Sequence, residues 1–295
     1  MRIRKPINKK TRIALGLASV AILVLFYSWL SHRQHQKNPA DTSIPNFSQL
    51  VGGVVDACTV KTPTAEEPDH RTWWWAYKPQ KNFETGVMER KLHYSWLYSD
   101  MKATYGRFFK GVGLSVLLSI IIGMAAGSFT KIDAFIRPPT AFQAFVPPTA
   151  ALAIFFVLVG TGEMLYTAVI VFGVFPSLTQ SIYYAATKDV DEHEIDKFYT
   201  LGASHFEVVY ELIFLKILPR IFGAIRLVIG PVMVYLIAVE WLVGDVGFGY
   251  ELKLQGRRLN MATVYFYLAI LGTTGFLMDY ALLTLRRKLC PYFGD

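Results

Sequence analysis

The stretch KDVDEHEIDKFYTLGASHFEVVYELIFLKILP, from Lys188 to Pro219, decides how the rest of the chain is interpreted. It lies between long apolar runs and is itself too polar to span a membrane. Asp191 and Ser204 each stand three residues before a glutamate, which is the spacing of a capping box at the start of a helix. Gly202 can end the first helix, because glycine enters the left-handed C-cap conformation without strain. The stretch therefore predicts a helix, a sharp turn and a second helix, lying at a membrane surface.

One face of this helix pair is predicted to be apolar. Large apolar side chains recur there at helical spacing. They are Phe198, Leu201, Phe206, Val209 and Leu212. An apolar face on a polar stretch outside the membrane indicates a surface that meets a partner.

The composition of the whole chain is that of an integral membrane protein. The 295 residues are 53% hydrophobic and only 18% charged, and apolar stretches near the length of a membrane span recur. The net charge of +8 could indicate nucleic acid as a partner. Basic residues that flank membrane spans are the ordinary signal of orientation, so we expect no nucleic-acid partner.

Six apolar stretches are predicted to cross the membrane. They are residues 13–30, 108–129, 141–159, 164–185, 221–243 and 261–284. Six spans place both termini and the 188–219 stretch on one side. Most of the basic residues lie on that side, including those of the tail at 1–12, so the positive-inside rule makes it cytoplasmic. The first span also resembles a signal peptide, but no clear small-residue cleavage site follows it, and we expect it to remain uncleaved.

The predicted fold class is an all-α membrane protein with six transmembrane helices and an insertion after the first. Residues 1–30 are expected to form a cytoplasmic tail and the first helix, and residues 31–105 an extracytoplasmic segment. Residues 106–290 are expected to form a five-helix core that includes the 188–219 stretch.

The extracytoplasmic segment has two features of its own. A short helix is expected from Phe47 to Ala57. The run Trp73–Trp75 could bind a partner or a ligand. Its alternatives are an aromatic anchor at the membrane interface or a small core within the insertion.

The chain lacks the common motifs of enzymes. It has no GxxxxGK[ST] phosphate loop, no GxSxG and no HExxH. Its six histidines show no metal-binding spacing. We expect no catalytic residue, no metal site and no cofactor in this chain, so any ATP-driven process would use an ATPase on another chain.

Several short motifs occur along the last two-thirds of the chain. They are Pro147-Pro148, Gly160-Thr161-Gly162-Glu163, Val190-Asp191, Leu201-Gly202-Ala203-Ser204, Leu218-Pro219, Arg226, Glu240 and Gly247-Phe248-Gly249-Tyr250. With these motifs, residues 100–293 resemble the permease subunits of bacterial ABC importers, in the nitrate/sulfonate/taurine group. The family's cytoplasmic loop begins Glu-Ala-Ala, where this chain has Asp196-Lys197-Phe198.

The resemblance implies a type I ABC importer permease fold in the bacterial inner membrane. It implies as partners two ABC ATPase subunits that bind ATP and Mg²⁺, an extracytoplasmic solute-binding protein, and a second permease, identical or paralogous. The solute would be a small anion. The residues that the resemblance assigns to ATPase coupling are Asp196, Lys197, Phe198, Gly202, Ala203, Ser204 and Pro219.

Glu240, Arg226 and Glu163 are candidates for the solute path. Acids inside a membrane are costly and usually face the interior of a helix bundle or a cavity. For Glu240 the alternative is a structural hydrogen bond to a neighbouring span. Arg226 could instead extend its charged end to the membrane surface.

Two other function classes stay open at this point. A channel or secondary transporter would work without an ATPase, and it predicts broken helices or ionisable residues near the membrane midplane in repeated halves. No convincing internal repeat is visible in the chain. A membrane scaffold that keeps the permease fold is the other alternative, and the altered residues at 196–198 leave room for it.

Overall fold

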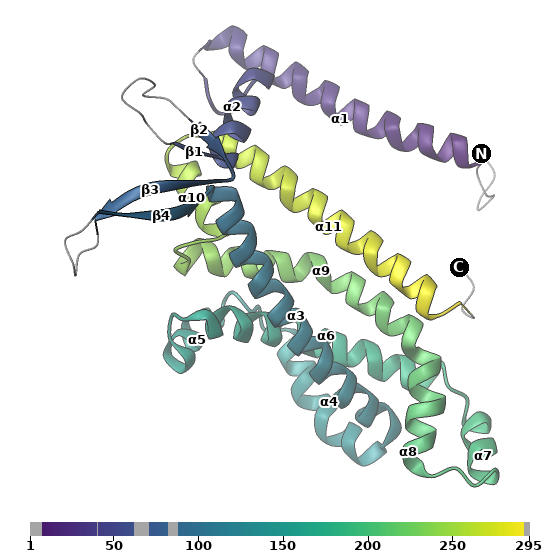
Figure 1. Cartoon of the computed structure of the whole chain (residues 1–295). Helices are drawn as coiled ribbons and strands as arrows, with labels where there is room; N and C mark the ends of the chain where they lie inside the picture. Colours follow the sequence, from purple (N-terminus) through teal and green to yellow (C-terminus); the bar gives the residue numbers. More distant parts are fainter. Residues whose placement is uncertain (1–7, 40, 62–70, 82–87, 292–295) are drawn as a thin grey trace. The chain divides into compact units, whose positions relative to one another are not determined.

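The computed structural model describes residues 8–39, 41–61, 71–81 and 88–291 (Figure 1). The described elements, in chain order, are α1 (Lys9–Lys37), α2 (Phe47–Cys58), β1 (Thr59–Lys61), β2 (Arg71–Trp73), β3 (Trp75–Lys81), β4 (Met88–Tyr94), α3 (Trp96–Ser128), α4 (Thr130–Ala144), α5 (Leu152–Val159), α6 (Glu163–Lys188), α7 (Glu192–Thr200), α8 (His205–Glu207), the π-helix η1 (Val208–Phe214), α9 (Leu215–Val243), α10 (Phe248–Arg257) and α11 (Met261–Leu289). The chain divides into two compact units. The N-terminal unit comprises Met1–Ser95 and Leu254–Phe266, and the core unit comprises Trp96–Lys253 and Tyr267–Asp295.

In the N-terminal unit, α2 is held at its start by a capping box. The Asn46 side chain accepts the backbone N–H of Gln49 at 2.9 Å, and the Gln49 side chain accepts the backbone N–H of Asn46 at 2.8 Å. The hydroxyl of Tyr27 on α1 donates to the carbonyl of Pro45 at 2.6 Å, which ties the two helices together. The short helix predicted from Phe47 to Ala57 is confirmed.

The described part of the core unit is all-α as predicted, but the N-terminal unit also contains four strands, which the prediction did not include. β1 pairs with β2, and β3 pairs with β4, both antiparallel. The sequence reasoning missed them because β1 and β2 have only three residues each, and because β3 and β4 are mostly polar and show no regular apolar alternation. The side chains of Trp73–Trp75 are exposed, which excludes the small core among the predicted alternatives. Partner binding and membrane anchoring stay predictions.

Five helices among the described residues are long and apolar enough to cross a membrane. They are Lys10–Lys37, Trp96–Ser128, Glu163–Lys188, His205–Val243 and Met261–Leu289. Each of them covers one of the predicted spans. The remaining predicted span, over residues 141–159, is not one helix, so the count of six spans is not confirmed.

The interruption of that predicted span lies at its proline pair. Helix α4 ends at Ala144 and α5 begins at Leu152, and the residues between them are not α-helical. Pro147 and Pro148 lack backbone N–H groups and restrict the residues before them, which explains a break at this point. Lys131 and Arg137 lie between the predicted spans 108–129 and 141–159, and both belong to α4.

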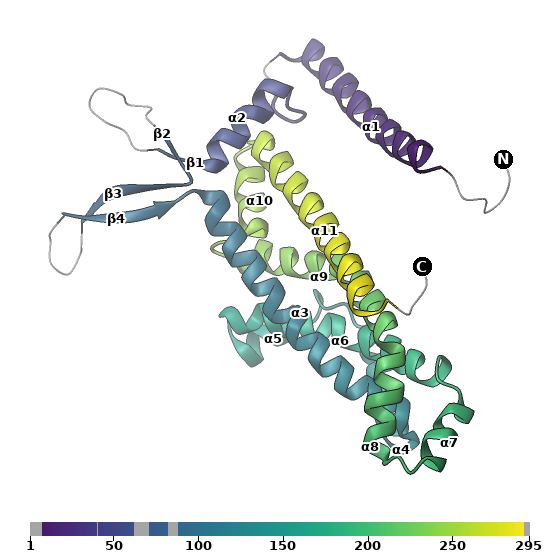
Figure 2. The same cartoon turned by 45° about the vertical axis from the view of Figure 1, so that its right-hand side comes forward.

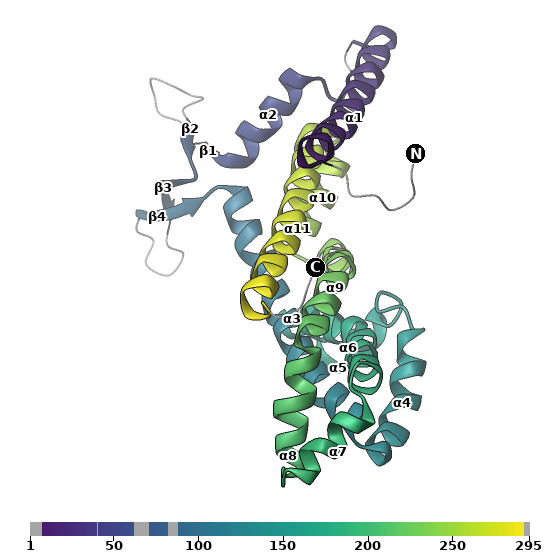
Figure 3. The ribbon, with the colours of Figure 1, turned by 90° about the vertical axis from the view of Figure 1, so that its right-hand side faces the viewer.

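In the core unit, α3 and α6 lie side by side (Figure 3). Small residues on α3 let these two helices approach closely. A Cβ atom at Gly111 would lie 2.7 Å from Ile170, and one at Gly123 would lie 2.9 Å from Ile182. Inside a bilayer, where lipid is as apolar as the helices, such close packing is a main source of helix association.

Replacing Gly123 with leucine should destabilise the core unit. The added side chain would overlap Ile182, and overpacking of this kind typically costs about 1–3 kcal/mol. Thermal unfolding of the purified protein in detergent should show a lowered midpoint for Gly123→Leu. Gly113→Leu is the matched control, because Gly113 lies on the same helix and a Cβ atom added there would have no neighbour within 4 Å. Equal destabilisation by both variants would contradict the packing account.

Candidate functional site

Both predicted capping boxes in the 188–219 stretch are confirmed. Asp191 caps α7, and its carboxylate accepts the backbone N–H of His193 at 3.3 Å. Ser204 caps α8, and the carboxylate of Glu207 accepts the backbone N–H of Ser204 at 2.6 Å. These side chains satisfy N–H groups that a helix start leaves without a partner. Figure 2 shows α7 and α8 together at one end of the core unit.

The turn between the two helices depends on Gly202. Its φ angle is +89°, which an L-residue with a Cβ atom adopts only under strain. The N–H of Ala203 donates to the carbonyl of Phe198 at 3.0 Å, and the N–H of Gly202 donates to that of Tyr199 at 3.0 Å. This bonding closes the end of α7 in the manner of a Schellman motif, as predicted for Gly202.

The second arm of the stretch is not a separate surface helix. From His205 the chain is helical without a break through η1 and α9 to Val243. Pro219 is buried within α9, where it cannot donate a hydrogen bond to the preceding turn. The predicted span from residue 221 therefore begins earlier, and the turn at Gly202 is attached directly to a membrane-crossing helix.

The predicted apolar face divides into two parts. Phe198, Val209 and Leu212 pack against the buried core. Leu201 and Phe206 do not, and their exposed fractions are 85% and 78%. The structure therefore leaves two large apolar side chains exposed on either side of the Gly202 turn.

Two ion pairs join the beginning of the 188–219 stretch to the start of α9. Lys216 pairs with Glu194 on α7, and Arg220 Nε lies 3.1 Å from Asp189 Oδ2. The hydrogen bond from Lys216, helped by the backbone N–H of Asp191, lowers the pKa of the Glu194 carboxyl. Because the pKa of Glu194 is lowered in the folded protein, the stability that this ion pair contributes is fully present above the ordinary glutamate pKa. That contribution is lost as the pH falls through the lowered pKa.

A largely buried polar cluster lies in the same unit, outside that stretch. Its members are Asp100, Thr104, Arg107, Glu163, Glu240 and Tyr267. Glu240 has no exposed surface. The hydroxyl of Thr104 lies 2.9 Å and 3.0 Å from the two carboxylate oxygens of Glu240, and Arg107 Nη1 donates to one of them at 3.1 Å.

Arg107 joins the two acids that were predicted for the solute path. Its Nη2 lies 2.7 Å from Glu163 Oε1, and its Nη1 donates to the carbonyl of Val246 at 2.8 Å. The guanidinium also lies over the ring of Tyr166, 3.9 Å from its centroid. Glu163 differs from Glu240 because 61% of its side chain is exposed.

The connection from α9 to α10 folds closely over Glu240. The N–H of Gly249 donates to Glu240 Oε2 at 3.0 Å, and the N–H of Gly247 donates to Asp100 Oδ1 at 2.9 Å. Gly247 has a φ angle of +123°, and a Cβ atom there would lie 2.5 Å from Glu240 Oε1. Glycine is required at this position both for its conformation and for space.

Arg226 is not part of this cluster. Its guanidinium makes two hydrogen bonds to Asp279 on α11, at 2.7 Å and 2.8 Å. The contacts of Glu240 agree with the alternative that it makes a structural hydrogen bond to a neighbouring span. Contact of Glu240, Arg226 or Glu163 with the solute stays a prediction. Within the described residues, no group of three or more His, Cys, Asp or Glu side chains could hold a metal ion.

Sequence reasoning missed four members of the cluster. Asp100, Thr104 and Arg107 lie within α3, in residues assigned to the extracytoplasmic segment or to the boundary of the span. Their spacing of four and three residues places them on one face of a helix, and that signal was available. Tyr267, whose hydroxyl donates to Asp100 at 2.7 Å, stands in an apolar run with no comparable signal.

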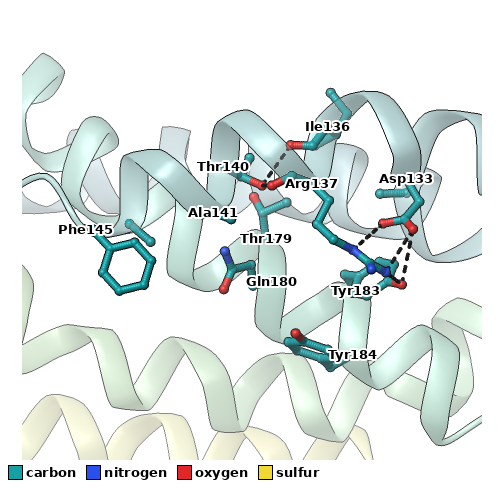
Figure 4. Close-up of a pocket in the computed structure, with 12 residues that line it drawn as sticks. Asp133, Ile136, Arg137, Thr140, Ala141, Phe145, Thr179, Gln180, Tyr183 and Tyr184 are labelled. Carbon is teal, nitrogen blue, oxygen red and sulfur yellow. Dashed lines mark hydrogen bonds and ion pairs between the residues drawn. The ribbon is translucent and has the colours of Figure 1, made fainter.

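A cavity of about 230 Å³ lies between α4 and α6 (Figure 4). Arg137 pairs with Asp133, with Nε 3.0 Å from Oδ1, and it lies over the ring of Tyr183. Thr179 also lines the cavity, and its hydroxyl is buried without a hydrogen-bond partner among the described residues. Gln180 lies beside it along the same wall.

The sequence model of a family described as "Binding-protein-dependent transport system inner membrane component" matches residues 115–289. The chain belongs to this family. It is therefore a membrane component of an ABC importer and not an enzyme, and ATP hydrolysis belongs to a separate subunit. The resemblance indicated by the motifs is confirmed.

Individual permeases similar to the chain differ in the solutes their names give. The taurine transport system permease protein TauC of Escherichia coli is 27% identical over 68% of this chain and 72% of its own length. The formylaminopyrimidine transport permease protein ThiX of Halalkalibacterium halodurans is 24% identical over 62% and 74%. The bicarbonate transport system permease protein CmpB of Synechocystis is 23% identical over 71% and 73%.

Solved structures support the fold. Two inward-facing structures of the MetNI methionine ABC transporter match with TM-scores of 0.53 and 0.54, at 14% and 17% identity. Each match covers 66% of this chain, and the matches cover 94% and 96% of the MetNI chains. The core of the permease therefore has the fold of these importers.

Glu240→Ala should destabilise this permease strongly. The substitution would leave the buried guanidinium of Arg107 without the carboxylate of Glu240, and breaking a buried ion pair in this way typically costs about 3–5 kcal/mol. Glu163→Gln should cost less than about 1 kcal/mol, because Glu163 is largely exposed. Thermal unfolding in detergent measures both. If the two variants were equally destabilised, Glu240 would not have the structural role described.

Proposed function

We propose that this permease forms the transmembrane pathway of an ATP-driven importer for a small anion, of the nitrate, sulfonate or taurine kind. The observation that carries the proposal is the 188–219 stretch. It presents a capped, glycine-hinged turn with exposed Leu201 and Phe206, and its second arm is continuous with the helix His205–Val243. A partner that moves this turn would move a membrane-crossing helix with it.

The partner at this turn is proposed to be an ABC ATPase. ATP binding would close the ATPases and push on the turn, and the helices would switch between inward-facing and outward-facing packings. Leu201 and Phe206 would enter an apolar groove of the ATPase, while exposed Asp196 and Lys197 would meet its rim. The residues proposed for coupling are Asp196, Lys197, Phe198, Gly202, Ala203, Ser204 and Pro219.

The proposed assembly contains two permeases, identical or paralogous, two ATPases and an extracytoplasmic solute-binding protein. Both termini and the 188–219 stretch would face the cytoplasm, and residues 31–105 the opposite side. Residues 141–159 would complete the six passages through α4 and α5 despite the break between them. This chain would bind no cofactor of its own, and ATP and Mg²⁺ would bind the ATPase.

The cavity between α4 and α6 is the proposed place of contact with the solute. A buried hydroxyl without a partner costs free energy, so the unpaired hydroxyl of Thr179 supports a role in hydrogen bonding to a ligand. Arg137 supplies a positive charge there, and Asp133 balances it. An anion would therefore take over part of the hydrogen bonding that Arg137 makes to Asp133. Glu163, Glu240 and Arg226 would then act on the path indirectly, by holding helices in place.

Leu201→Ala with Phe206→Ala should uncouple the permease from its ATPase without unfolding it. Both side chains are exposed, so their loss should change stability by less than about 0.5 kcal/mol. The measurement is purification of the permease from its native host, with mass-spectrometric quantification of any co-purified chain that carries Walker motifs. Phe135→Ala is the matched control, because Phe135 on α4 is similarly exposed. Undiminished ATPase recovery with the double variant would refute the docking role.

Thr179→Val should separate solute contact from stability. Removing an unsatisfied buried hydroxyl while keeping its shape should leave the unfolding midpoint unchanged or raise it. Uptake of labelled taurine, nitrate and bicarbonate by cells that express the importer should show a raised KM for whichever solute is carried. Thr140→Val is the control, because Thr140 already donates to the carbonyl of Ile136 at 2.9 Å. An unchanged KM for Thr179→Val would remove this cavity from the solute path.

A further inference from the structure

A second cavity, of about 710 Å³, is lined by residues of α6, α9 and α11. Each of these helices contributes one cationic residue to its lining. They are Lys188 from α6, Arg220 from α9 and Arg286 from α11. Lys188 stands in the last turn of α6 and Arg286 in the last turn of α11, so the cationic rim lies at the ends of two membrane-crossing helices.

The lining of this cavity contains more cationic than acidic residues. Asp189 is the one carboxylate among the described lining residues, and it pairs with Arg220 at 3.1 Å. The ammonium group of Lys188 lies over the ring of Tyr184, 5.5 Å from its centroid. Three cationic side chains and one acidic side chain therefore line one cavity.

The polarity of the cavity changes along its length. On α9 the lining runs from Arg220 through Gly223 and Ala224 to Leu227. On α6 it runs back from Lys188 to Ser181. Seven residues of helix correspond to about 10 Å, so the cations lie at one end and small or apolar residues lie about 10 Å deeper. Leu227 is 79% exposed, so the apolar end of the lining reaches the surface of this chain.

We propose that this cavity binds the headgroup of an anionic phospholipid, such as phosphatidylglycerol. The phosphate would lie among Lys188, Arg220 and Arg286, and the start of an acyl chain would follow the small and apolar residues toward Leu227. Basic pockets between transmembrane helices at the cytoplasmic side are suited to such headgroups. A free oxyanion would use the cationic rim but would have no use for the apolar end. Because Lys188 and Asp189 begin the 188–219 stretch, the lipid would tie α11 to the arms of that stretch.

Native mass spectrometry of the full-length permease in detergent tests this proposal. Phosphatidylglycerol and phosphatidylcholine with the same acyl chains are titrated separately, and we expect a clear preference for phosphatidylglycerol. Lys188→Gln with Arg286→Gln should weaken phosphatidylglycerol binding by about tenfold or more. Arg287→Gln with Lys288→Gln removes the same charge at the end of the same helix α11 and outside the cavity, and should retain the preference. Equal loss in both double variants, or no preference in the unaltered protein, would overturn the proposal.

A second variant fills the cavity and leaves its charges in place. No atom lies within 4 Å of a Cβ position built on Gly223, so Gly223→Leu adds volume toward open space. We expect Gly223→Leu to lose the preference for phosphatidylglycerol and Gly223→Ala to keep it. Retention of the preference by Gly223→Leu would overturn the assignment to this cavity.

A competition with inorganic phosphate distinguishes a lipid from a soluble anion. The phosphate is added at millimolar concentration to the protein with bound phosphatidylglycerol. The lipid should stay bound, because the acyl chain adds contacts that free phosphate lacks. Full displacement by inorganic phosphate would assign the cavity to a soluble oxyanion and refute the lipid proposal.

Discussion

The guanidinium of Arg107 is the charge on which one end of the core unit depends. It is buried, and it bonds Glu240 on α9, Glu163 at the start of α6 and the carbonyl of Val246 beyond α9. A charge taken out of water is tolerated only where its partners satisfy it in a fixed geometry. One side chain of α3 thus sets the positions of α6, α9 and the connection to α10. The glycines of that connection follow from the same requirement, because the chain must pass close to Glu240 for the Gly249 N–H to donate to its carboxylate.

The 188–219 stretch reaches the same helix from its other end. Lys216 and Arg220, near the start of α9, pair with Glu194 and Asp189, while Glu240 stands near its end. With 29 residues, α9 is about 44 Å long. A stiff helix fixed by ion pairs at both ends transmits displacement better than a loop would. This gives a physical route from the proposed ATPase contact to the buried polar cluster.

Local chemistry explains which predictions were correct. Asp191, Ser204 and Gly202 act on residues within one turn, so their spacing alone was sufficient to place two caps and a turn. The apolar pattern of the stretch could not tell Phe198, which packs on the core, from Leu201, which is exposed. Periodicity identifies a face, but it does not identify what covers that face.

The sequence by itself determined that the chain is a membrane protein, where most of its spans lie, and that it belongs among the importer permeases. Apolar length, charge bias and capping motifs are properties of neighbouring residues, and they need no knowledge of the fold. Only the tertiary structure decided that residues 141–159 are broken, and that Pro219 lies within a continuous helix. It also decided that Arg107 joins Glu163 to Glu240, and that Lys188, Arg220 and Arg286 line one cavity. These outcomes depend on residues far apart in the chain, and only the packing of the helices places such residues together.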